Sequence, residues 1–157
     1  MLKSVINQTS SLDDPTIGLV REEDVFFLVL NRKDNVFDFD YIERINKCLD
    51  IVAEAKGARV LITVGSHPRC FSTGFDLKCF TATPLNPFTV ATRMILMLKK
   101  LLTLPVPTMC VMNGKAVAGG FIFALCHDVR IMQANATIEL SEFNIGLPLP
   151  GSYSEVV

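Results

Sequence analysis

Hydrophobic and polar positions along the chain follow two different periods. Short runs of apolar, mostly β-branched residues bounded by turn residues predict strands. The first run, "IGLVREEDVFFLVLN", is divided by three consecutive acidic residues, Glu22, Glu23 and Asp24, and therefore predicts a hairpin. Further buried strands are predicted from "ARVLITVG" and "TMCVMNG", and two short ones from "VRIMQA" and "ATIEL".

Three other segments repeat their apolar residues at the spacing of a helix. In "DFDYIERINKCLDIVAEA", Asp38 or Asp40 can cap the first turn and Gly57 follows the end. The other two are "PFTVATRMILMLKKLLTL" and the shorter "GGFIFALCHD", which starts at a pair of glycines. Because helices alternate with strands, the chain predicts a layered α/β fold with right-handed crossovers.

Length and composition set limits on this picture. The 157 residues are half apolar and one fifth charged, which suits one globular domain with a real core. We expect a loosely structured leader over residues 1–15 and a single core over residues 16–157. The formal net charge of −1 excludes a strong electrostatic attraction to nucleic acid or to an anionic membrane.

Membrane insertion and disulfide bonding are not expected. The longest apolar segment, 106–125, contains Asn113, Lys115 and three glycines, so we place it in a core. The five cysteines form no CxxC pair, and the N-terminus has no hydrophobic signal core. Reduced thiols in an intracellular protein are the better interpretation.

Two loops share a pattern that suits binding of a polarised oxygen. "FSTGFDL" and "NGKAVAGGF" each follow a buried strand, precede a helical segment and contain glycine. Unpaired N–H groups at such junctions attract an oxygen, and two that converge would form an oxyanion hole. Either loop taken alone is better explained as an ordinary turn.

A third candidate is Glu142 in "TIELSEFNIGLPLP". Apolar neighbours such as Leu140, Phe143 and Ile145 would suit a proton-transferring base near neutral pH. A solvated acid in the first turn of a helix is the alternative. Glu139 is expected to face solvent from a strand.

The remaining polar residues suggest no other chemistry. We interpret His67 as surface, and the pair His127 and Asp128 as structural groups at a helix end. With two histidines and no ligand cluster, no metal site is expected, and the lysine of "VMNGKAVAGG" is misplaced for a phosphate-binding loop.

Five stretches, taken in order, resemble the crotonase superfamily, also called the enoyl-CoA hydratase/isomerase family. They are "LNRKDNVFD", "FSTGFDL", "LPVPTMCVMNG", "AVAGGFIFALCHDVRI" and "SEFNIGLPLPG". The resemblance implies a spiral of stacked ββα units and an acyl-CoA thioester substrate, with no separate cofactor because coenzyme A is part of the substrate. It places the oxyanion donors at Phe75 and Gly119. The implied substrate- or CoA-binding residues are Ser72, Gly74, Asp76, Leu77, Lys78, Gly120 and Ile122.

One departure from the family pattern narrows the reaction. Hydratases of the family carry two catalytic glutamates, and the first of these positions is Ile122 here, whereas the second matches Glu142. A single carboxylate is similar to the pattern of Δ3,Δ2-enoyl-CoA isomerases of fatty acid β-oxidation, in which one base moves a proton from C2 to C4. The alternatives are another crotonase reaction, such as hydration, and a non-catalytic relative that binds acyl-CoA or a partner subunit.

A second departure is the C-terminus, where the chain ends at "GSYSEVV". Full-length relatives continue through further helices and form trimers, so we expect this chain to lack the C-terminal helical region. Apolar surface around Phe123, Leu125 and Leu147 is then expected to be uncovered. A peroxisome or mitochondrion is the expected compartment, with the cytosol left open.

Overall fold

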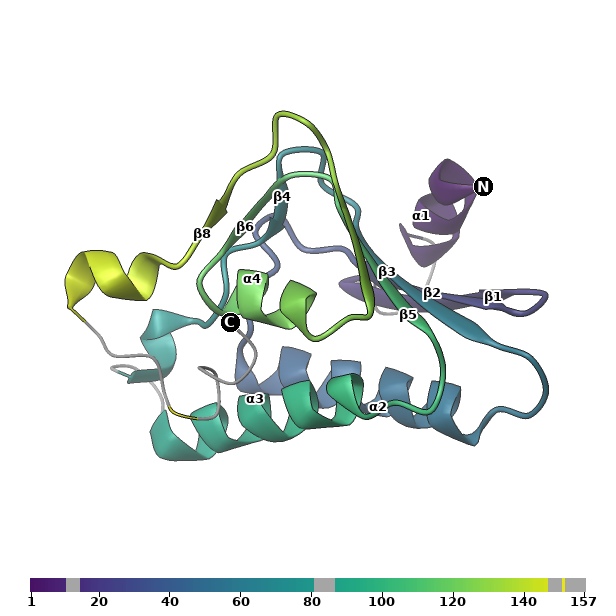
Figure 1. Cartoon of the computed structure of the whole chain (residues 1–157), viewed down its shortest axis with the longest axis horizontal. Helices are drawn as coiled ribbons and strands as arrows, with labels where there is room; N and C mark the ends of the chain where they lie inside the picture. Colours follow the sequence, from purple (N-terminus) through teal and green to yellow (C-terminus); the bar gives the residue numbers. More distant parts are fainter. Residues whose placement is uncertain (11–14, 81–86, 147–150, 152–157) are drawn as a thin grey trace.

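The computed structural model describes residues 1–10, 15–80, 87–146 and 151, which build two β-sheets (Figure 1). The larger sheet has the strand order β1-β2-β3-β5-β7, antiparallel between β1 and β2 and parallel elsewhere. The smaller is the parallel sheet β4-β6-β8. Their bounds are β1 (Ile17–Glu22), β2 (Val25–Leu30), β3 (Val60–Gly65), β4 (Cys70–Ser72), β5 (Thr108–Met112), β6 (Lys115–Val117), β7 (Val129–Met132) and β8 (Ile138–Glu139).

Successive strands pass from the larger sheet to the smaller one three times, as β3–β4, β5–β6 and β7–β8. The first two pairs are followed by helices, α3 (Pro87–Leu102) and α4 (Gly119–Leu125), which return the chain to the larger sheet. Figure 1 shows the sheets meeting at an angle with α4 between them. The repeated ββα spiral is therefore present, and the short strands β4, β6 and β8 bring the loops after them to one region.

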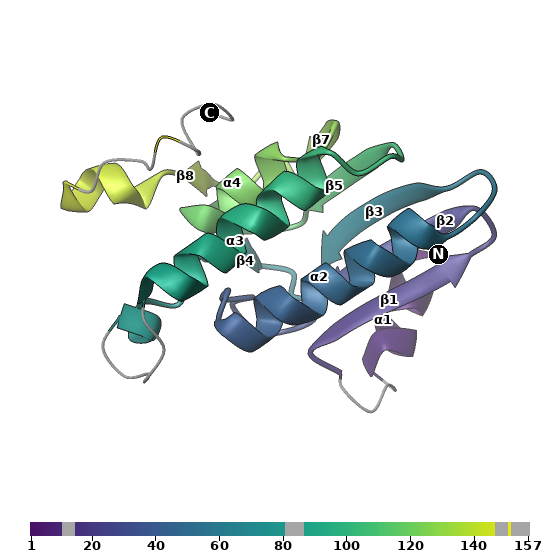
Figure 2. The ribbon, with the colours of Figure 1, turned by 90° about the horizontal axis from the view of Figure 1, so that it is seen from below.

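Helix α2 (Phe39–Glu54) begins where the sequence predicts. The Asp38 carboxylate accepts a hydrogen bond of 2.8 Å from Tyr41 N, which caps the first turn. The helix ends at the cap residue Ala55, two residues before Gly57. It lies beside α3 under the larger sheet (Figure 2) and buries the stripe of Tyr41, Ile42, Ile45, Leu49 and Val52.

Strand β2 is buried on both faces, which explains its unbroken apolar sequence. Phe26, Leu28 and Leu30 point into the main core with α2, α3 and α4. The alternate residues Phe27 and Val29 point to the other face, into a second, smaller core. That second core is completed by Val5, Val20 and Val64.

The expectation of a loosely structured leader before Pro15 is wrong for residues 2–10. They form helix α1 (Leu2–Ser10), which packs on β1 and β2 and buries Val5 and Thr9 completely. Gly18 makes room for it, because a Cβ on Gly18 would lie 2.3 Å from Thr9 Oγ1. The helix was missed because few of its residues are apolar, so its sequence pattern is weak.

The uncovered apolar surface lies elsewhere than expected. Phe123 is fully buried, with its ring 5.3 Å from Phe37 and 5.3 Å from His127, centroid to centroid. Leu125 is half-buried, and Leu147 lies outside the described residues. Among the described residues after α4, large apolar side chains are exposed on β7, on β8 and just after β8, at Val129, Ile131, Met132, Ile138 and Phe143.

The cysteines behave as buried thiols. The four whose side chains are described are free, and burial raises the pKa of Cys48 and of Cys126 to about 11. They are therefore protonated near neutral pH. In the described parts of the chain, no helix has both the length and the apolar character needed to cross a membrane.

Candidate active site

The turn after β4 and the turn before α4 lie directly against each other. Gly74 has φ +84°, a conformation that favours glycine, and a Cβ there would lie 2.7 Å from Gly119 N. A Cβ on Gly119 would lie 3.6 Å from Phe75 N. The structure thus brings together the two backbone segments whose N–H groups the resemblance assigns as donors.

A second close approach joins the same two loops. A Cβ on Gly120 would lie 2.6 Å from Ser72 O and 2.7 Å from Ser72 Oγ. Ser72 is fully buried, and its hydroxyl donates to Asn35 O at 2.7 Å and accepts from Gly74 N at 3.1 Å. Packing therefore requires glycine at both 74 and 120, and at 74 the positive φ favours glycine as well.

Ala118, directly before Gly119, holds an unfavourable backbone conformation. Its φ of 51° and ψ of −130° are rare for a residue with a Cβ. The pairing of β6 with β8 holds it there, because Ala118 N donates to Glu139 O at 2.7 Å. Strain of this kind is concentrated at functional sites, so Ala118 adds independent support for a site at the start of α4.

The segment before α2 is hydrogen-bonded to the turn that contains Gly74. Phe37 N donates to Gly74 O at 2.8 Å, and Asp76 N donates to Phe37 O at 3.1 Å. Thr73 N also donates to Asp34 O, at 3.0 Å. "LNRKDNVFD" and "FSTGFDL" are therefore one structural unit, although they are far apart in the chain.

Glu142 lies in the one-turn helix η2 (Ser141–Ile145) and is half-buried. Its Oε2 atom is buried and has no hydrogen-bond partner among the described residues. A buried carboxylate oxygen without such a partner carries a desolvation cost, which a proton or a bound group would relieve. Leu140 packs on the main core, but Phe143 is 62% exposed, so only part of the expected apolar neighbourhood surrounds the carboxylate.

Glu142 reaches the same region through strand pairing. Val117 pairs with Glu139 in the smaller sheet, so Gly119 and Glu142 follow the paired ends of β6 and β8. The Glu139 side chain is exposed, as expected, and its Oε1 accepts from Asn144 Nδ2 at 2.6 Å.

The other residues assigned by resemblance occupy varied positions. Ile122 is fully buried in the main core. Asp76 caps the short helix η1 (Leu77–Phe80), its Oδ1 accepting from Lys78 N at 2.9 Å. Leu77 and Lys78 are exposed, at the outer side of the turn.

His127 and Asp128 are structural, as the sequence predicts. His127 is buried between Phe123 O and Thr63 Oγ1, and Asp128 accepts from Thr108 N at 2.8 Å. Hydrogen bonds from Thr108 hold the pKa of the Asp128 carboxyl below its usual value. His67 is partly exposed, and its Nδ1 accepts from Arg69 N.

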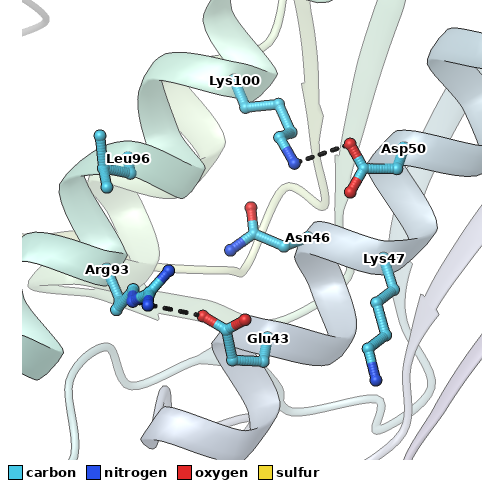
Figure 3. Close-up of a pocket in the computed structure, with 7 residues that line it drawn as sticks. All are labelled: Glu43, Asn46, Lys47, Asp50, Arg93, Leu96 and Lys100. Carbon is cyan, nitrogen blue, oxygen red and sulfur yellow. Dashed lines mark hydrogen bonds and ion pairs between the residues drawn. The ribbon is translucent and has the colours of Figure 1, made fainter.

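A groove between α2 and α3 lies outside this site (Figure 3). Two ion pairs cross it, Lys100 to Asp50 at 2.8 Å and Arg93 to Glu43 at 3.8 Å. Four of the charged side chains that line the groove are thus paired across it, and Leu96 is the one apolar residue among the described residues of the lining. The groove offers none of the features of the glycine loops.

Known proteins resemble this chain in sequence and in fold. A family model described as enoyl-CoA hydratase/isomerase matches residues 21–156. The chain is 35% identical to enoyl-CoA delta isomerase 3 of Arabidopsis thaliana, over 88% of this chain and 61% of that protein. It is 33% identical to enoyl-CoA delta isomerase 2, peroxisomal, of the same plant, with the same coverage.

Hydratases are also among the similar proteins. The chain is 27% identical to human methylglutaconyl-CoA hydratase, mitochondrial, over 88% of this chain and 42% of that one. A solved structure of an enoyl-CoA hydratase/isomerase family protein from Pseudomonas syringae superposes with a TM-score of 0.82 at 26% identity, covering 94% of this chain and 62% of that chain. The chain spans about 61% of the length of the plant relatives.

Proposed function

Because the chain belongs to the enoyl-CoA hydratase/isomerase family, we propose that it shifts the double bond of a 3-enoyl-CoA to give the trans-2-enoyl-CoA. The observation that carries the proposal is the contact between the Gly74–Phe75 turn and Gly119. It is supported by the buried Oε2 of Glu142, which has no hydrogen-bond partner among the residues that the structure describes. The two plant isomerases share 35% and 33% identity with this chain, and the human hydratase 27%.

The proposed reaction is a proton shuttle that uses one base. The Glu142 carboxylate removes a proton from C2 of the substrate, and the electron pair delocalises into the thioester carbonyl to give a dienolate. The N–H groups of Phe75 and Gly119 donate to the oxygen that gains charge, each worth about 3 kcal/mol. Glu142 then returns the proton to C4, so the double bond moves and nothing else is consumed.

Ile122 favours isomerisation over hydration in this proposal. Its side chain is a fully buried hydrocarbon at the position where the sequence resemblance places the first of the two catalytic glutamates of hydratases. A hydrocarbon cannot hold or activate a water molecule, whereas the proton shuttle needs no water. Hydration remains the second candidate because a hydratase is among the relatives. The compartments named for relatives, peroxisome and mitochondrion, are the ones we propose for this chain.

The test measures formation of the conjugated thioester, which absorbs in the ultraviolet, from a 3-enoyl-CoA. Glu142→Gln is expected to lower the turnover at least about 100-fold, because it removes the proton carrier. Glu139→Gln is the matched control, since it changes an exposed carboxylate three residues away, and turnover should stay within about twofold of the unchanged protein.

Three outcomes contradict the proposal. An unchanged rate in Glu142→Gln removes that residue as the base. Loss of the conjugated absorbance of a trans-2-enoyl-CoA through water addition would establish hydration instead. Binding of acyl-CoA without any turnover would favour the non-catalytic relative.

A further inference from the structure

We propose that Asn35 is a positioning residue that holds the Phe75 N–H donor in place through the hydroxyl of Ser72. The inference rests on the proposed function, because it concerns the same donor. Asn35 is fully buried and is not among the residues assigned to catalysis or to substrate binding. Its side chain and its backbone carbonyl both contribute, in separate ways.

The side-chain amide of Asn35 is fully hydrogen-bonded. Its Nδ2 donates to Phe71 O at 2.8 Å and to Leu30 O at 3.3 Å. Its Oδ1 accepts from Arg32 N at 2.8 Å and from Tyr41 Oη at 3.1 Å. Two donors and two acceptors exhaust what an amide can offer, so the residue is fixed in one orientation. It also ties the end of β2 to β4.

The backbone carbonyl of Asn35 is connected to the Gly74 turn by hydrogen bonds. Asn35 has φ +44°, which asparagine tolerates better than most residues, and this conformation turns its carbonyl toward β4. Ser72 Oγ donates to that carbonyl at 2.7 Å and accepts from Gly74 N at 3.1 Å. One buried hydroxyl thus links Asn35 to the residue before Phe75.

The other end of Gly74 is held by Phe37. Gly74 O and the N–H of Phe75 belong to one planar, trans peptide, in which the C=O and N–H point in opposite directions. Because Phe37 N donates to Gly74 O at 2.8 Å, the Phe75 N–H is aimed away from Phe37. Glycine has no side chain to restrict it, so these two hydrogen bonds set its conformation. Residues 35–37 therefore determine the direction of the proposed donor.

The decisive variant is Ser72→Ala, which removes the hydroxyl link and little else. We expect kcat for the 3-enoyl-CoA to fall about 10- to 100-fold with KM changed by less than about threefold, because a misdirected donor weakens transition-state binding more than substrate binding. Thr73→Val is the matched control. It removes a hydroxyl that donates to Asp34 O at 3.2 Å in the same turn, whereas Gly74 N donates to Ser72 Oγ. The kcat of Thr73→Val should stay within about threefold of the unchanged protein.

A spectroscopic measurement separates positioning from general damage. Hexanoyl-CoA labelled with ¹³C at the thioester carbon is bound, and its carbonyl stretch is read by isotope-edited infrared difference spectroscopy. A well-placed N–H pair lowers this frequency, so Ser72→Ala should lose much of the shift while thermal unfolding confirms the fold. Asn35→Gly, which permits the positive φ but lacks the amide, should lose the shift as well.

The two proposals fail in different ways. If the unchanged protein turns over substrate and Ser72→Ala alters neither kcat nor the carbonyl shift, the positioning inference is overturned. If the unchanged protein shows the shift but no isomerisation, the proposed function fails, and the Ser72→Ala spectrum still decides the inference. An unchanged protein that binds the labelled thioester with no shift overturns both, because no donor pair then acts on the oxygen.

Discussion

The side chains of His127 and Thr63 join the end of α4 to the middle of the larger sheet. His127 Nε2 lies 2.8 Å from Thr63 Oγ1, and the other ring nitrogen lies 3.1 Å from Phe123 O. A neutral imidazole satisfies both contacts by donating to the carbonyl and accepting from the hydroxyl. Burial lowers the pKa of His127 to about 4 from its ordinary 6.5.

This contact predicts a loss of stability on mild acidification. Between about pH 6.5 and pH 4 the unfolded chain binds a proton at His127 and the folded one does not. Neutral His127 therefore makes its full contribution to the free energy of unfolding above about pH 6.5. As the pH falls from there to about 4, the free energy of unfolding drops by an amount on the order of 3 kcal/mol. Urea unfolding at a series of pH values measures it. His127→Gln should flatten that part of the curve, and an equally steep curve would contradict the assignment.

Gly74→Ala and Gly57→Ala separate backbone strain from steric clash. Both glycines have positive φ, +84° and +87°, but a Cβ on Gly57 meets nothing within 4 Å, whereas one on Gly74 lies 2.7 Å from Gly119 N. We expect Gly57→Ala to cost about 1–2 kcal/mol of unfolding free energy, since only the backbone conformation is disfavoured. Gly74→Ala should cost more and abolish isomerisation. Equal losses of stability would show that the two loops do not touch in solution.

Phe123 is expected to be among the most sensitive core positions. It is fully buried against the rings of Phe37, Phe71 and His127, so Phe123→Ala should lower the free energy of unfolding by about 3–5 kcal/mol. The exposed Phe143 provides the control, for which Phe143→Ala should change stability by less than about 0.5 kcal/mol. Chemical denaturation of both variants gives the comparison, and similar values would be inconsistent with this core.

The ion pairs across the groove between α2 and α3 should contribute little to the free energy of unfolding. Lys100 and Asp50 lie 2.8 Å apart, but their side chains are 35% and 55% exposed. Water and salt screen such pairs, so Lys100→Met should change the unfolding free energy by less than about 1 kcal/mol. Unfolding in low and high salt tests this. A loss above about 2 kcal/mol that salt does not reduce would mean that the pair is better shielded than its exposure indicates.

Most of the fold could be predicted from the local pattern of apolar and polar residues, and most of the candidate site from the resemblance to a family. The hairpin, helix α2 and the strands β3 and β5 were predictable because each carries a strong period and clear end signals, such as Asp38. The strands β4 and β6 were not, since these three-residue strands lie in or beside the glycine-containing stretches "FSTGFDL" and "NGKAVAGGF", which predict loops. Their pairing depends on the larger sheet bringing them together, which no local pattern encodes.

The candidate site, too, could be predicted only in part. Glycine in two loops indicated backbone approach, but which loops meet was set by the stacking of the two sheets. Asn35 lies within a family stretch, but the sequence around it indicates no function, because its hydrogen bonds reach residues 36 and 37 positions away, Phe71 and Ser72. Strain at Ala118 likewise comes from the pairing of β6 with β8, and the residue type alone gives no sign of it.

The strand order of the larger sheet has a consequence for synthesis of the chain. In β1-β2-β3-β5-β7 each strand after the first pairs with one that precedes it in the sequence. As the polypeptide leaves the ribosome, the strand with which each new strand pairs has therefore already been synthesised, and the sheet grows at one edge only. Pairing does not have to wait for a segment still to be translated, so the slow step expected of parallel sheets is divided into short, successive additions.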